Sequence, residues 1–188
     1  MDATSLSDAE LSNLYGAALH PERLDALEAE MTPRSLHKLD SFSASLLKEL
    51  FDTAEQGLGT TRFVYCELPI LWVIDATGTL WFSIEEIVEI ATREFSWPRL
   101  RRTFVAEGYE KLGHPALIGG FEGRIGGELL FDNEADPPCW YMTNRSGRYG
   151  LRPGRTAQHL ANAAKLLAGY GIRVEIFFIR PKGTGEAP

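Results

Sequence analysis

The first 57 residues show the apolar spacing of helices. Ser7 to Glu10 is a capping box, in which the serine oxygen accepts from the third helical amide and the glutamate reaches back to the serine amide. We therefore expect a helix from this box to about His20. Apolar residues at spacings of three and four predict a second helix over residues 21–31 and a longer one over 33–57, ended by glycine.

From Thr61 the spacing of apolar residues changes from the helical repeat toward every second position, which is typical of strands. A second capping box at Ser83 to Glu86 instead predicts a helix through residue 90, and the apolar spacing predicts another over 99–112. The remaining chain predicts a hairpin, one helix and a last strand. The expected strands are 62–68, 69–75, 79–82, 123–131, 139–144 and 172–179, with turns at 76–78 and 132–138 and a helix at 156–168.

These elements predict an α+β fold, with an N-terminal helical layer packed on a mostly antiparallel β-sheet. The expected organisation is an acidic helical layer (1–60), an α+β module (61–180) and a disordered tail (181–188). A length of 188 residues with 44% apolar content suits one compact globular domain.

The negative charge is concentrated in the helical layer. Residues 1–60 hold 11 acidic and 4 basic side chains, which accounts for the whole net charge of −7. This distribution argues against general nucleic-acid binding, because no basic excess is present to displace counterions from phosphates. It favours instead a protein partner with a basic surface, met by an acidic face that includes Glu22, Asp25, Glu28 and Glu30.

Other classes of function are also disfavoured. The apolar runs are too short to span a membrane, and the N-terminus lacks a basic-then-apolar signal, so we expect a cytoplasmic protein or an effector exported without such a signal. Two cysteines exclude a disulfide framework, and the four histidines show no metal-ligand spacing. We therefore expect no metal and no resident cofactor.

Six glycines fall within fifteen positions between Gly113 and Gly127. Such a density predicts either bulges and tight turns within a sheet or a backbone cleft for a ligand. It is not a phosphate-binding loop, because neither G-x-x-x-x-G-K-[ST] nor a G-x-G-x-x-G between strand and helix is present. Further along, Arg145, Arg148, Arg152 and Arg155 lie in a stretch without acids that could hold an anionic group.

Three segments resemble a module of bacterial polymorphic toxins and secreted effectors, fungal proteins and plant IQ-motif calmodulin-binding proteins. That module has W-x-V-x-x-x-G-x-L, then H-S-S-x-L-x-G-G, A-G-E-L and N-x-S-G-H-Y-x-P. The matching residues here are Trp72, Val73, Gly78 and Leu80, then His114, Leu117, Gly119, Gly120, Gly127, Glu128 and Leu129, then Asn144, Ser146, Gly147 and Tyr149.

This resemblance covers about residues 70–170 and departs from the module at several positions. Pro115 and Ala116 replace the two serines, Arg148 replaces the histidine, and the proline is displaced to Pro153. No IQ motif is present, so calmodulin binding does not follow. The resemblance implies a role in a bacterial toxin or effector system without implying a particular reaction.

Two hypotheses for the function remain. The first is a partner-binding protein, immunity-like or effector-associated, that binds through the acidic face and the arginine loop. Its expected ligand-binding residues are Glu128, Asn144, Arg145, Ser146, Arg148 and Tyr149. The alternative is an enzyme of the ADP-ribosyltransferase type that uses NAD through His114, Tyr149 and Glu175, which occur in the required order.

Overall fold

The computed structural model describes residues 6–57, 59–101 and 104–181. Its main sheet has the strand order β1-β3-β2-β7-β8-β9, with every neighbouring pair antiparallel except β8 and β9. The strands are β1 (His37–Lys38), β2 (Ile70–Asp75), β3 (Leu80–Ile84), β7 (Gly123–Asp132), β8 (Cys139–Thr143) and β9 (Glu175–Phe177). The predicted mostly antiparallel sheet is thus confirmed.

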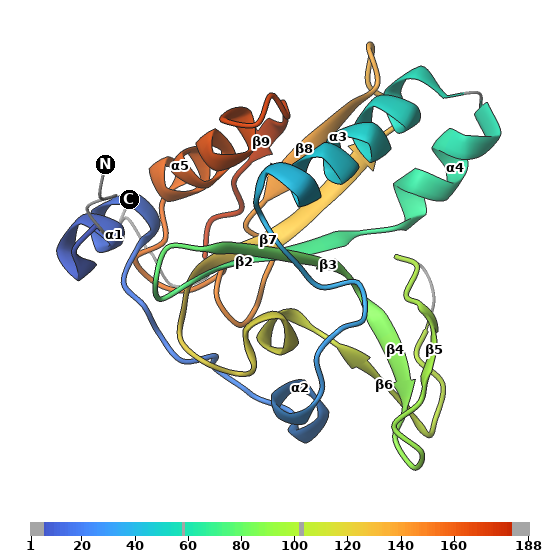
Figure 1. Ribbon diagram of the computed structural model, residues 1–188, viewed down its shortest axis with the longest axis horizontal. Coiled ribbons are helices and arrows are strands. Elements are labelled where there is room, and N and C mark those ends of the chain that lie inside the picture. The colour runs from blue at the N-terminus through green and yellow to red at the C-terminus, as the bar shows by residue number, and fades with distance from the viewer. Residues whose placement is uncertain (1–5, 58, 102–103, 182–188) are drawn as a thin grey trace, which may run out of the picture.

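Helices cover both faces of this sheet (Figure 1). One side holds α3 (Ser41–Gln56), α4 (Gly59–Glu67) and α5 (Ala157–Ala168), with α1 (Asp8–Tyr15) beside α5. The other side holds α2 (Ala26–Glu30) and the 3₁₀ helix η1 (His114–Ile118). The α+β class is confirmed, and the helical layer is divided between the two faces.

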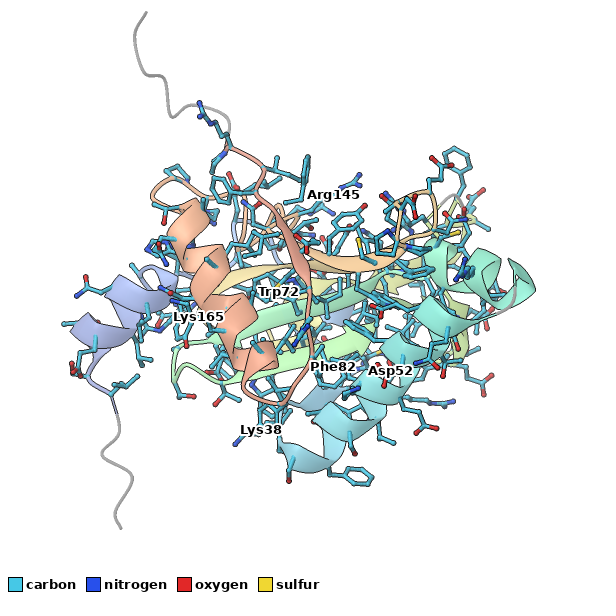
Figure 2. The ribbon with its side chains drawn as sticks, turned by 90° about the horizontal axis from the view of Figure 1, so that it is seen from above. Lys38, Asp52, Trp72, Phe82, Arg145 and Lys165 are labelled. Atoms are coloured by element: carbon cyan, nitrogen blue, oxygen red, sulfur yellow. The ribbon has the colours of Figure 1, made fainter. Side chains whose placement is uncertain are left out.

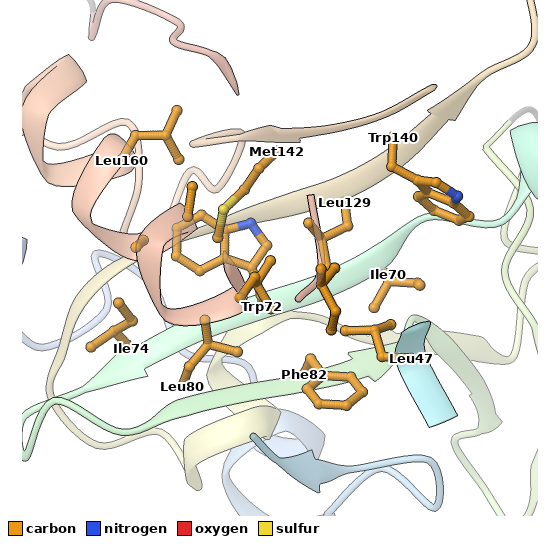
Figure 3. Close-up of a cluster of buried hydrophobic side chains, with 14 of the residues drawn as sticks. Leu47, Ile70, Trp72, Ile74, Leu80, Phe82, Leu129, Trp140, Met142 and Leu160 are labelled. Carbon is orange, nitrogen blue, oxygen red and sulfur yellow. The ribbon is translucent and has the colours of Figure 1, made fainter. Parts of the chain in front are cut away.

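The main core lies between the sheet and helices α1, α3 and α5 (Figure 3). Trp72 is fully buried there, and its indole N–H donates to the Thr143 carbonyl at 3.2 Å. The rings of Phe51 and Trp140 stack with centroids 4.0 Å apart, which fixes α3 over β8. A smaller cluster on the opposite face joins Val73, Leu117 and Tyr149 and places η1 against the sheet.

A second, three-stranded sheet contains the segment for which we predicted a helix after Ser83. It has the order β5-β4-β6, from β4 (Glu86–Glu89), β5 (Phe95–Pro98) and β6 (Tyr109–Leu112). The helix prediction is wrong because the acids of the supposed capping box bind distant partners instead. Glu85 pairs with Arg99 and Lys111, and Glu86 accepts from the Ser35 amide at 2.8 Å.

Two other predictions of local structure are wrong, and a third is confirmed only in part. The predicted helix over 99–112 is β6 preceded by a loop, of which residues 102–103 lie outside the described residues. The apolar residues expected on one face of that helix are not buried together, because Phe104 is 95% exposed whereas Leu112 of β6 is fully buried. Residues 62–67 of the strand predicted over 62–68 form most of α4 instead, which lets Tyr65 and Cys66 both pack on the core. The last strand contains only Glu175–Phe177.

The N-terminal helices are shorter than predicted. α1 ends at Tyr15 because Gly16, with φ 86°, turns the chain. The long helix begins at Ser41, where Asp40 caps the amides of Phe42 and Ser43, and β1 precedes it. The hairpin at 132–138 and the helix predicted over 156–168 are confirmed. The tail predicted over 181–188 lies, beyond Pro181, outside the described residues.

Candidate functional site

The glycine-rich segments pack directly against one another. A Cβ on Gly127 would lie 1.8 Å from the Thr143 carbonyl oxygen, and one on Gly150 would lie 2.0 Å from that of Gly126. Both distances are far inside van der Waals contact, so these positions require glycine. The close backbone approach that the glycine density predicted therefore occurs at these two positions between segments of the chain itself.

Three predicted ligand-binding residues support the loop between β8 and α5. The buried Asn144 amide accepts from the Ile179 N–H at 2.7 Å and donates to the carbonyls of Ile179 and Gly150. The Ser146 hydroxyl accepts from the Tyr149 amide, and the Tyr149 hydroxyl donates to the Phe121 carbonyl at 2.9 Å. Burial raises the pKa of Tyr149. Because all three side chains are buried, they act as scaffold.

Three arginines of the same loop hold the N-terminal segment. Arg148 donates to the Arg23 carbonyl and pairs with Asp25 at 3.0 Å and Glu28 at 3.4 Å. The guanidinium of Arg152 contacts the His20 carbonyl at 3.4 Å. Arg155 is buried and donates to the carbonyls of Ala17 and Tyr149.

Arg145 differs from these three arginines. Its side chain is exposed at the edge of the molecule (Figure 2) and makes no hydrogen bond or ion pair within the described part of the chain. The arginine-rich stretch therefore leaves a single guanidinium open to a ligand.

Arg145 lines a polar cavity of about 330 Å³, formed by the motif segments, α2 and the second sheet. Four cationic and three carboxylate side chains line this cavity, together with His114. The charged residues are Arg99, Lys111, Arg145, Arg148, Glu28, Glu85 and Glu128. Such a density of titratable groups around one small space is typical of functional sites.

The three carboxyl groups of the cavity differ in their environments. Burial raises the pKa of Glu85, but Lys111 and Arg99 outweigh it, so the net shift is downward. Burial raises the pKa of Glu28, although Arg148 and backbone amides oppose it. Burial also raises the pKa of Glu128, and Arg145 only partly offsets this. The Glu128 carboxyl has no hydrogen-bond partner among the described residues, so it is available to a ligand.

His114 lies in the cavity wall as a neutral imidazole. Desolvation lowers its pKa to about 4, although a hydrogen bond to the Gly127 carbonyl opposes the shift. The Nε2 atom lies 2.9 Å from that carbonyl oxygen, which can only accept, so Nε2 bears the proton. Nδ1 therefore retains its lone pair and can accept a hydrogen bond from a ligand.

The structure does not bring His114, Tyr149 and Glu175 together. His114 lines the polar cavity, whereas Tyr149 is enclosed in the small cluster beneath the sheet. Glu175 is exposed on β9 opposite Tyr141 and lines a different cavity with Cys139. The three residues that the transferase hypothesis needs in one pocket lie in three separate environments.

Four cavity residues were missed by the sequence analysis as members of a ligand site. Glu28 comes from α2, and Glu85, Arg99 and Lys111 come from the second sheet and its connections. No local motif marks them, because only the pairing of β4 with β6 and the packing of α2 place them here.

Parts of the predicted acidic docking face are used within the chain. Glu28 is 2% exposed, Asp25 pairs with Arg23 and Arg148, and Glu30 pairs with Arg93 at 2.5 Å. Of these four acids, Glu22 is exposed without an ion pair among the described residues. The expectation of four exposed acids is therefore wrong for Glu28, which is buried, and Asp25 is half-buried, whereas Glu22 and Glu30 are exposed.

Neither a metal centre nor a membrane helix is seen in the described ranges. Across them, no group of three or more His, Cys, Asp and Glu side chains is placed to hold a metal ion. No helix within these ranges combines the length and the apolarity needed to cross a bilayer. Comparison of the chain with protein-family models, curated proteins and solved structures gave no match.

Proposed function

We propose that this protein is a binding protein that takes an anionic group of its partner into the polar cavity, where Arg145 pairs with it. One observation supports this most strongly. Of the four cationic side chains lining the cavity, Arg99 and Lys111 pair with Glu85 and Arg148 pairs with Asp25 and Glu28, while Arg145 has no ion pair among the described residues. An incoming anion gains a charge-assisted contact there without breaking an existing one.

The neighbouring groups offer an anion both a hydrogen-bond acceptor and a hydrogen-bond donor. The neutral His114 offers an acceptor at Nδ1, and the raised pKa of Glu128 increases its protonated fraction. A phosphate monoester that still bears one proton can accept from Arg145 and donate to His114 Nδ1, and a carboxylate can accept from both Arg145 and the protonated form of Glu128. The cavity volume of about 330 Å³ suits a single side chain or a small group rather than a cofactor of dinucleotide size.

The proposed partner belongs to a bacterial toxin or effector system, in which this protein is immunity-like or effector-associated. The motif resemblance supports this assignment, because three of its segments contribute to one cavity wall through His114, Glu128 and Gly147. The separate locations of His114, Tyr149 and Glu175 give no support to the NAD-dependent alternative, and we do not propose it.

Titration of the ¹⁵N-labelled protein with inorganic phosphate and with acetate tests this function. We expect saturable amide shifts around residues 113–114, 127–128 and 145–148. Arg145→Ala should weaken the apparent affinity about tenfold, which corresponds to roughly 1.4 kcal/mol for one charge-assisted contact.

The matched control is Arg173→Ala, which removes an exposed arginine beside a different cavity. It should leave the titration unchanged. Equal weakening by both substitutions would mean that net charge alone attracts the anion. An absence of saturable shifts at the cavity with either anion would also contradict the proposal.

A further inference from the structure

A second concave site lies on the face of the sheet that carries η1, and it has a different chemistry from the polar cavity. This apolar groove, of about 710 Å³, is lined by Leu36, Trp81, Ala116, Leu117, Ile118 and Phe121. Leu36 comes from the N-terminal layer, Trp81 from β3 and the others from η1 and the turn that follows it. The groove is large enough for a bulky side chain.

The aromatic wall of the groove is fixed before any ligand binds. The Trp81 indole N–H donates to Asp75 Oδ2 at 2.8 Å, and Asp75 Oδ1 accepts from the amides of Thr77 and Thr79. The turn between β2 and β3 thus sets the orientation of the ring. A side chain that packs against Trp81 would not have to order it, so the entropic cost of binding is reduced.

Phe121 marks the open side of the groove. Its side chain is 72% exposed, although its carbonyl is held by the Tyr149 hydroxyl. The backbone is therefore anchored, and the ring contributes little to the folded core. An exposed aromatic ring at the rim of an apolar cavity is typical of a surface that a partner covers.

The rim of the groove is acidic. Asp75 and Glu122 line it, and Glu122 lies 3.4 Å from His20, whereas no lysine or arginine lines it among the described residues. The charge of this surface complements a cationic occupant and disfavours an anionic one.

We propose that the apolar groove binds a basic peptide segment of a protein partner. An aromatic side chain of that segment enters between Trp81 and Phe121, and flanking lysine or arginine side chains lie toward Glu122 and Asp75. This site is independent of the anion site, since the two cavities share no lining residue. If experiment disproves binding at one of the two sites, the proposal for the other site is therefore unaffected.

The test uses three acetylated and amidated peptides: Gly-Lys-Phe-Lys-Gly, Gly-Glu-Phe-Glu-Gly and Gly-Lys-Ser-Lys-Gly. Each is titrated into the ¹⁵N-labelled protein while the indole N–H resonance of Trp81 is followed. The first peptide should shift that resonance saturably. Reversing the peptide charges or removing the phenyl ring should each weaken binding at least tenfold.

Two pairs of variants locate the binding surface. Phe121→Ser should weaken binding of the first peptide at least fivefold, whereas Phe42→Ser, which removes a 67% exposed phenylalanine from α3, should have no effect. Glu122→Gln should weaken binding, while Glu49→Gln, on an exposed face of α3, should not.

Three results would overturn the proposal. One is no saturable shift at Trp81, and another is equal binding of the lysine and glutamate peptides. The third is a dimer in sedimentation equilibrium that Phe121→Ser dissociates, because the occupant would then be a second copy of this chain. The proposal expects a monomer.

Discussion

At the scale of single residues, two kinds of glycine occur in the motif segments. Gly127 lies where a Cβ would collide with the Thr143 backbone, whereas a Cβ on Gly147 would meet no atom within 4 Å beyond its chain neighbours, and φ there is not positive. The glycine density visible in the sequence did not distinguish them, because the distinction depends on which strand lies opposite.

Gly127→Ala should therefore lower the free energy of unfolding by about 3 kcal/mol or more, since β8 must move to admit the methyl group. Gly147→Ala should change it by less than about 0.5 kcal/mol. Urea denaturation of both variants provides the measurement. A Gly127→Ala protein as stable as the parent would refute the close packing of β7 against β8.

His114 should make stability depend on pH. Its pKa is about 4 in the folded protein against an ordinary 6.5. The unfolded chain therefore binds more protons between these values, so stability should fall as the pH is lowered from about 6.5 toward 4. The full effect is about 3 kcal/mol.

The variant His114→Gln should lose less stability than the parent between pH 7 and pH 4.5, by about 2 kcal/mol. His37→Gln, at an exposed position of β1, serves as the control. Urea denaturation at the two pH values measures the difference. An identical loss in the parent and in His114→Gln would show that this imidazole is not held neutral.

Among the elements, the loop after β8 holds the N-terminal segment in place through hydrogen bonds. Three of its arginines, Arg148, Arg152 and Arg155, donate hydrogen bonds to backbone carbonyls of residues 17–23. Most of the arginines that the sequence suggested for a ligand site therefore have partners within the chain. The residue types indicated an anion site, and only the structure shows that Arg145 alone of the four stays open among the described residues.

Arg155→Ala should cost about 3 kcal/mol of stability, because the buried guanidinium bonds two carbonyls that would lose their partners. Arg145→Ala should change stability by less than about 0.5 kcal/mol. Thermal melts and urea titrations of the pair measure this contrast. Comparable losses in both variants would mean that Arg145 is also part of the scaffold.

The sequence predicted elements best where all local signals agreed. Strand β2 is a short apolar run followed by the turn at 76–78, helix α5 has apolar residues at helical spacing before Gly169, and both formed as expected. The helix prediction for residues 83–90 was wrong because Glu85 and Glu86, which suggest a helix start, bind residues that are distant in the sequence. Glu85 forms ion pairs with Arg99 and Lys111, and Glu86 accepts hydrogen bonds from the backbone amides of Arg34 and Ser35. Long-range ion pairs of this kind leave no local pattern.

In the whole molecule, we expect the acidic third and the sheet module to unfold as one cooperative unit, because they share buried cores. Leu11, Tyr15 and Leu27 are buried in the shared cores. Arg124, at 1% exposure, donates to the Gly16 carbonyl and pairs with Asp8 at 2.5 Å. Part of the negative charge of the N-terminal third is thus balanced inside the molecule.

A truncated chain that begins at residue 32 should consequently fail to fold. It would expose the apolar residues beneath α1 and α2 and remove the contacts of the buried Arg124 with Asp8, Ser12 and Gly16, although those with the Ala76 carbonyl remain, a penalty of several kcal/mol. Circular dichroism and thermal melting should show no cooperative transition. A truncated protein with the amide spectrum of the parent would contradict the single unit.

Arg145 is the cation of the polar cavity that has no ion pair among the described residues, and we propose that it receives the anionic group of a partner. The most direct measurement follows the arginine Nε–H resonances of ¹⁵N-arginine-labelled protein during titration with inorganic phosphate. We expect a saturable shift of the Arg145 resonance, while those of Arg148 and Arg155, already engaged with Asp25 and with backbone carbonyls, stay unchanged. An unshifted Arg145, or equal shifts of all three resonances, would contradict it.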